Sequence, residues 1–161
     1  MNVVFLRAAN VGGRFFSPRK LADALGMVSL GAAGTFVAPA RVTRAAILRR
    51  LPFDAEVMIR PAREILNLVQ NPPFGRAAGR RFVSVLGKRS PTPPEVPIDA
   101  PAKGRWTVRV LKVAGAYAFS LWRRGDGPPL YPNAVIEKSL GVPATTRGWD
   151  TVVALAELLR R

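Results

Sequence analysis

The chain has 161 residues, and its 25 basic side chains against 10 acidic ones give a net charge of +15 at neutral pH. It contains neither cysteine nor histidine, which excludes disulfides, thiolate nucleophiles, imidazole bases and metal sites built on sulfur or imidazole. The carboxylates show no paired-acid or calcium-loop spacing, so we expect neither a metal nor a cofactor.

The first part of the chain alternates short strands and helices. Val3 to Leu6 is an apolar run typical of a buried strand, and a loop over 10–17 follows it. Ser17 and Pro18 supply an N-cap and a first-turn proline, and Gly26 supplies a stop, which predicts a helix over 18–25. Similar signals predict the following elements: a glycine-containing strand over 28–38, a helix over 41–51, a strand over 56–60, a helix from Pro61 to the Asn-Pro-Pro at 71–73, and a strand over 81–86.

The proline-rich segment 89–103 predicts an extended connector, because proline has no backbone N–H to donate. Strands over 106–113 and 116–122 then form a hairpin, and helices over 132–140 and 149–160 follow. Mixed helices and strands with one hairpin predict an α+β sandwich. We expect a single compact unit over 1–161, divided by the connector into a β/α half at 1–88 and a ββαα half at 104–161.

The sequence predicts a cytoplasmic protein. The longest stretch without a charge, 24–40, contains glycines and a proline and is shorter than the roughly 20 apolar residues of a membrane span. The N-terminus has no basic segment before its apolar residues, so we interpret it as a strand and not as a signal peptide.

Two motifs lie near the two ends of the chain: Leu6 to Gly13 (LRAANVGG) and Gly141 to Thr151 (GVPATTRGWDT). Together with segments 33–37, 82–86 and 131–140, they resemble the bacterial domain-of-unknown-function family 1697 over nearly the whole chain. The resemblance implies an alpha-beta sandwich of two intertwined ferredoxin-like halves, and it implies no particular activity. The chain departs from the family pattern at Ala8-Ala9 and at Thr35, where the family usually has Asn.

The first candidate site is the loop after the first strand, with Asn10, Gly12, Gly13 and Arg14. Backbone N–H groups of such a loop can turn toward an anion, and Arg7 or Arg14 would supply charge. The loop lacks the Lys-Ser/Thr ending of a P-loop and the third glycine of a dinucleotide fingerprint. The alternative is a tight strand-to-helix turn without a ligand.

The second candidate site is the predicted start of the last helix, with Thr145, Thr146, Arg147 and Trp149. A threonine hydroxyl would cap the helix, and the free N–H groups with Arg147 would hold a carboxylate or phosphate. The alternative is structural, with a capping threonine, a packed tryptophan and an arginine paired to a carbonyl or an acid.

The third candidate site is the predicted helix start with Tyr131, Asn133, Glu137 and Lys138, which offer mixed donors and acceptors. Glu137 and Lys138 are adjacent and therefore face different sides of a helix, so they do not form a ready acid/base pair.

Three functions remain open from the sequence. The leading hypothesis is a non-catalytic module that binds an anionic small molecule or a protein partner where the Asn10 loop approaches the Thr145 to Trp149 turn. The second is a nucleic-acid-associated basic protein, although the basic residues are dispersed along the chain, which also fits a solvated surface. The third is an enzyme without histidine or cysteine chemistry, with Glu137 as the first acid to test.

Overall fold

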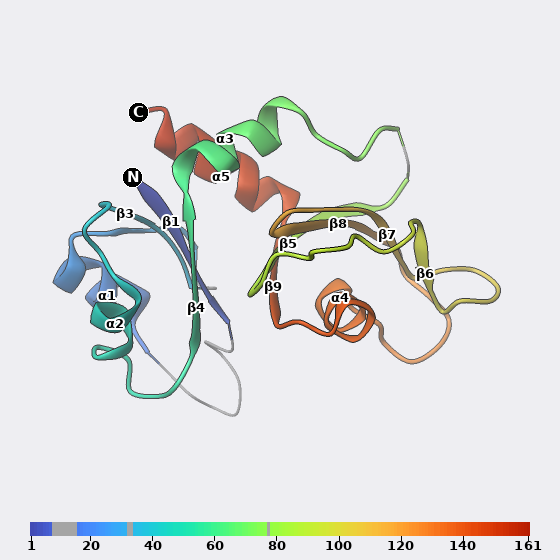
Figure 1. Ribbon diagram of the computed structural model, residues 1–161, viewed down its shortest axis with the longest axis horizontal. Helices are drawn as coiled ribbons and strands as arrows, with labels where there is room; N and C mark the ends of the chain where they lie inside the picture. Colours follow the sequence, from blue (N-terminus) through green and yellow to red (C-terminus); the bar gives the residue numbers. More distant parts are fainter. Residues whose placement is uncertain (8–15, 32–33, 77) are drawn as a thin grey trace. The chain divides into compact units, whose positions relative to one another are not determined.

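The computed structural model describes residues 1–7, 16–31, 34–76 and 78–161. Helices and two antiparallel sheets confirm the α+β class (Figure 1). The contacts divide the chain into two compact units, which are described separately: unit 1 is Met1–Gln70 with Val153–Arg161, and unit 2 is Asn71–Val152. The predicted connector over 89–103 lies inside unit 2.

Unit 1 contains a four-stranded antiparallel sheet in the order β2-β3-β1-β4. Its strands are β1 (Asn2–Arg7), β2 (Val28–Ser29), β3 (Thr35–Ala38) and β4 (Glu56–Pro61), and its helices are α1 (Pro18–Leu25), α2 (Arg44–Leu48) and α3 (Ala62–Gln70). The predicted strand over 28–38 is two strands, because β2 and β3 pair with each other in antiparallel fashion. The predicted helix over 41–51 is shorter, because Thr43 caps it by accepting from the Ala46 N–H at 3.2 Å.

Both faces of this sheet are covered. Val4 and Leu6 of β1 pack with Leu21 of α1 and Ile47 of α2 in one apolar cluster. Side chains alternate along a strand, so Phe5 lies on the other face, where α3 contacts β1 and β4. Burial of each large side chain in this core contributes about 1.5–3 kcal/mol and holds α1 and α2 against the sheet.

Unit 2 contains a five-stranded antiparallel sheet in the order β6-β7-β8-β5-β9. Its strands are β5 (Arg80–Leu86), β6 (Ile98–Ala100), β7 (Val108–Ala114), β8 (Tyr117–Trp122) and β9 (Ala144–Gly148); α4 (Pro132–Leu140) follows β8, and α5 (Trp149–Leu159) begins in this unit and continues into unit 1. The predicted hairpin is confirmed, with Gly115 at a positive φ of 59° between β7 and β8.

The proline-rich segment, which the sequence predicted to be an extended connector without regular structure, contains a short strand. Residues 98–100 form β6, which pairs with β7 at the edge of the sheet. Prolines at 97 and 101 flank this strand, so their missing N–H groups do not interrupt its three paired residues.

The two faces of the unit 2 sheet pack against different partners. Figure 1 shows α4 along one face, where Val135 and Ile136 join the apolar side chains of that face. On the opposite face, Phe74 makes edge contacts with Phe119 and Trp149, at ring-centroid distances of 6.1 and 5.1 Å.

Candidate functional site

The first predicted site lies largely outside the described residues. Asn10, Gly12, Gly13 and Arg14 belong to the segment 8–15, which is not described. Arg7 ends β1 in unit 1, and its Nη1 lies 3.2 Å from Oε1 of Glu56 on the neighbouring strand β4. Its charge therefore already has a carboxylate beside it.

The prediction that a threonine of the second site caps the last helix is wrong. Thr145, Thr146 and Arg147 lie in β9, which runs antiparallel to β5 as far as Gly148, and α5 begins only at Trp149. The strand pairing keeps this backbone extended up to the helix, and the Thr146 hydroxyl has other partners. The residues proposed as a helix-start anion site are thus strand residues.

Thr146 instead joins the second predicted site to the third. Its hydroxyl donates to Oδ1 of Asn133 on α4 at 2.7 Å, and Asn133 Nδ2 donates to Oε1 of Glu137 at 2.8 Å. A hydroxyl has one proton to give, so in the 2.7 Å contact between Thr146 and Ser84 the serine must be the donor. We call Ser84, Thr146, Asn133 and Glu137 the polar chain.

The polar chain fixes α4 to the sheet and does not activate a nucleophile. The proton of the fully buried Ser84 hydroxyl points to another hydroxyl, and a serine nucleophile needs a base at that position. Ser120, on the same face of the sheet, is also fully buried, and its Oγ has no hydrogen-bond partner in the described part of the chain. The sequence signal for Ser84 was a single polar residue within the apolar run of β5.

The other two residues of the third site lie apart from this chain of hydrogen bonds. Tyr131 precedes α4, makes no side-chain cap and is 61% exposed. Lys138 is exposed in the last turn of α4 and lines a mainly apolar groove of about 580 Å³ that extends to β6.

Arg147 is a buried cation on β9. Its Nη1 donates to Thr145 Oγ1 at 2.6 Å and to the Thr146 carbonyl at 3.0 Å. Burial lowers the pKa of Arg147 to about 10, so the guanidinium is still charged at neutral pH. The Thr146 carbonyl is a partner of the kind that the structural alternative predicted for this arginine, which was pairing to a carbonyl or an acid.

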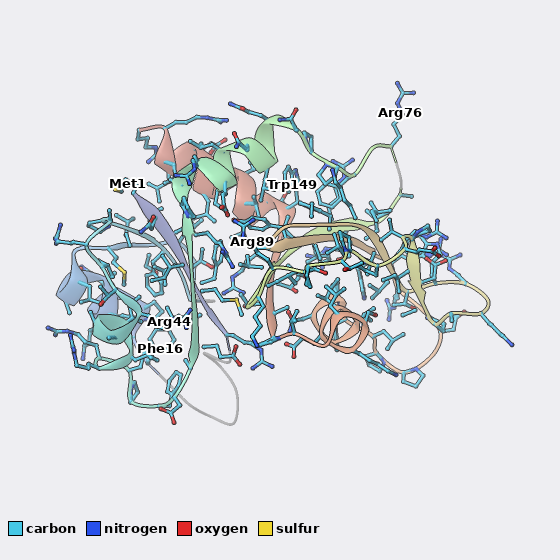
Figure 2. All side chains as sticks on the ribbon, viewed as in Figure 1. Met1, Phe16, Arg44, Arg76, Arg89 and Trp149 are labelled. Atoms are coloured by element: carbon cyan, nitrogen blue, oxygen red, sulfur yellow. The ribbon has the colours of Figure 1, made fainter. Side chains whose placement is uncertain are left out.

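Trp149 also has the structural role named as its alternative. It begins α5, as Figure 2 shows, and its ring packs edge-on against the buried Phe74. The indole therefore belongs to the core of unit 2.

A basic groove that the sequence did not reveal lies in unit 1, between α1 and the turn after α2. It has a volume of about 560 Å³, within the range of small-molecule sites. We call it the α1–α2 groove, and its lining residues are Phe16, Ser17, Lys20, Leu21, Ala24, Arg49, Arg50 and Pro52.

The charges of the α1–α2 groove all have one sign. Lys20, Arg49 and Arg50 are exposed on its walls, and the described lining contains no acidic residue. The groove also takes in the N-terminal end of α1, whose first turn carries no acid, so the helix dipole adds to the positive potential.

The remaining lining of the α1–α2 groove is largely apolar, and its side chains are held in place by packing within unit 1. Leu21 is buried in the unit 1 core. Phe16, labelled in Figure 2 just before α1, packs edge-on against Phe53 with ring centroids 5.9 Å apart. An apolar floor beneath three cations suits a ligand that combines a negative group with a flat or aliphatic body.

Comparison with known proteins identifies no relative of this chain. No known protein family, curated protein or solved structure matches the chain. Among the described residues, no helix is both long and apolar enough to cross a membrane, and no group of three or more acidic side chains could hold a metal ion.

Proposed function

We propose that this protein is a non-catalytic module that binds a small organic anion in the α1–α2 groove. One observation carries the proposal: Lys20, Arg49 and Arg50 line a single groove. The rest of its lining is largely apolar, and its described lining contains no acidic residue. An anion bound in this groove would be attracted by all three cations.

The groove distinguishes an organic anion from an inorganic one. Inorganic phosphate would contact only the cations, whereas an anion with a ring would also cover Phe16 and Leu21. Burial of apolar area adds about 25 cal/mol per Å² to binding. We expect a mononucleotide-sized ligand to bind more tightly than pyrophosphate or an uncharged nucleoside.

Calorimetry at low salt with AMP, pyrophosphate and adenosine tests this function. We expect AMP to bind most tightly, and the double variant Arg49→Gln, Arg50→Gln to weaken AMP binding at least tenfold, because two charge-assisted contacts are lost. Phe16→Ala should reduce the preference for AMP over pyrophosphate while leaving pyrophosphate binding unchanged.

A matched variant controls for net charge. Arg44 begins α2 and Arg63 lies on α3; both are exposed and neither lines the groove. The double variant Arg44→Gln, Arg63→Gln removes the same charge and should keep AMP binding within about twofold, since remote exposed charges are screened by salt. Equal losses in the two double variants, or no AMP binding at millimolar concentration, would overturn the proposal.

We also propose that unit 1 is one of the ferredoxin-like halves that the family resemblance implies. Its first six elements, from β1 to β4, follow the order β-α-β-β-α-β, and its antiparallel strands lie in the order β4-β1-β3-β2. An experimental structure of the chain that gave another strand order in this unit would contradict the assignment.

A further inference from the structure

Basic residues that are dispersed in the sequence gather at one end of the unit 2 sheet. Arg80 at the start of β5 pairs with Trp122 at the end of β8, and Trp122 pairs with Val108 at the start of β7. The β6–β7 loop and the segment after β8 meet at the same end, where the Arg123 N–H donates to the Thr107 carbonyl. We call the resulting group the sheet-end cluster: Arg80, Arg81, Lys103, Arg105, Arg109, Arg123 and Arg124.

The cluster has an excess of positive charge. Asp99 is already held by Arg109, whose Nε and Nη2 donate to its two carboxylate oxygens at 2.7 and 2.8 Å. The pKa of Arg123 is lowered, first by burial and then by the charges of Arg105 and Arg109. These guanidinium groups are therefore close enough to repel one another.

An aromatic ring lies among these cations. The Arg123 guanidinium carbon is 3.6 Å from the centre of the Trp106 ring, and that of Arg109 is 4.9 Å from it. Arg123 Nε also donates to the Trp106 carbonyl at 2.6 Å, which fixes the guanidinium at the indole. The pair forms a flat, charged surface of the kind on which nucleobases stack.

The cluster continues into a groove of about 340 Å³. This groove lies between the β6–β7 loop and the segment after β8. Lys103, Arg105 and Thr107 line one side of it, and Asp126 is the one acidic residue among its described lining, so the basic residues outnumber the acid. Figure 1 shows both segments at the β6 end of the sheet. Lys103, Arg105 and Arg124 are exposed, so their charges are available to a ligand.

We propose that the sheet-end cluster binds single-stranded nucleic acid. The exposed cations would neutralise successive phosphates, and the Arg123–Trp106 surface would stack an unpaired base. A single strand is favoured over a duplex because paired bases cannot reach a stacking surface. This site is in unit 2 and shares no residue with the α1–α2 groove, so the two proposals stand independently.

Fluorescence anisotropy with a labelled 15-nucleotide oligothymidine at several salt concentrations tests the proposal. We expect binding at 50 mM NaCl that weakens steeply with salt. The triple variant Lys103→Gln, Arg105→Gln, Arg124→Gln should bind at least tenfold more weakly and lower the log–log salt slope by about 2, since each lost phosphate contact on a single strand removes about 0.7.

Two controls make the result specific. The triple variant Arg19→Gln, Arg44→Gln, Arg63→Gln removes the same charge from exposed positions of unit 1 and should change affinity by less than threefold. The groove variant Arg49→Gln, Arg50→Gln should likewise keep oligothymidine binding.

One substitution in the sheet-end cluster should increase the affinity for oligothymidine instead of lowering it. Asp99→Asn removes the carboxylate that occupies Arg109, and it should strengthen binding because the cluster gains one net positive charge. Absence of binding at 50 mM NaCl, equal losses in the two triple variants, or equal affinity for a duplex of the same length would overturn the proposal.

Discussion

Thr146 on β9 and Asn133 on α4 are joined by a 2.7 Å hydrogen bond from the threonine hydroxyl to the amide oxygen. The bond fixes the direction of every proton in the polar chain, because Asn133 must then donate its Nδ2 to Glu137 and Thr146 must accept from Ser84. Each side chain of the polar chain depends on the next one for its hydrogen-bond partner. The polar chain should therefore respond to substitution as a unit.

Thr146→Val keeps the shape of the side chain and removes its hydroxyl. It leaves the fully buried Ser84 hydroxyl and Asn133 Oδ1 without their partner, so we expect the free energy of unfolding to fall by about 1–3 kcal/mol. Denaturant unfolding followed by tryptophan fluorescence measures this, because Trp106, Trp122 and Trp149 all lie in unit 2.

The same change at an exposed position serves as the control. Thr92→Val should alter stability by less than about 0.5 kcal/mol. Ser84→Ala combined with Thr146→Val should cost clearly less than the sum of the single variants, since the first loss already disrupts the chain. Strict additivity would show that the two hydroxyls do not act together.

Arg147 should make stability depend on pH in the alkaline range. Burial lowers its pKa to about 10 in the folded protein, well below the ordinary value of an arginine. The unfolded state therefore holds the proton more tightly than the folded state. Burial of the charge lowers the free energy of unfolding in full below pH 10, and this loss is relieved as pH rises above 10. Relative to Arg147→Met, the wild type should gain about 1.4 kcal/mol between pH 8 and pH 11.

Comparison of these two proteins isolates the guanidinium, because every other titrating group is common to both. Denaturant unfolding at several pH values between 8 and 11 gives the difference directly. Parallel stability curves over this range would show that Arg147 keeps its ordinary pKa despite burial.

The sequence predicted best those elements whose signals are local. Ser17, Pro18 and Gly26 gave both ends of α1, since the Ser17 side chain accepts from the Lys20 N–H and Gly26 is left-handed at a φ of 65°. A cap and a stop are short-range interactions, and the residues that make them lie within a few positions of the helix.

Elements that depend on distant pairing were predicted less well. Thr145 and Thr146 fit a helix cap and a strand equally, because threonine is both a capping and a β-branched residue. Their pairing with β5, about sixty positions away, decides for the strand. Thr146 and Asn133 were both predicted as site residues, but in two separate sites. The role of Ser84, the α1–α2 groove and the sheet-end cluster could not be predicted, because each forms only when distant segments fold together.

Gly141→Ala should destabilise the end of α4. Gly141 has a φ of 65°, and among the described residues no atom beyond its chain neighbours lies within 4 Å of the position its Cβ would take, so the cost comes from backbone strain alone. We expect a loss of about 1–2 kcal/mol in denaturant unfolding. Gly127→Ala is the matched control, since that position is equally open and has no positive φ; it should be neutral or slightly stabilising, and equal losses at both positions would contradict the strain argument.

Phe74→Ala should cause a large loss of stability in unit 2. The ring is 2% exposed and packs edge-on against both Phe119 and Trp149, so truncation leaves a cavity and removes two aromatic contacts. We expect a fall of about 3–5 kcal/mol in the free energy of unfolding. Near-ultraviolet circular dichroism should change as well, because Trp149 loses a ring neighbour.

Phe82→Ala is the comparison for this substitution. Phe82 is only half-buried on β5, so its truncation should cost clearly less than that of Phe74. Phe74→Leu should recover much of the lost stability, since leucine refills most of the cavity, but it should not restore the near-ultraviolet signal, because it has no aromatic ring. A cost at Phe74 no greater than at Phe82 would mean that the ring does not hold Trp149 at the start of α5.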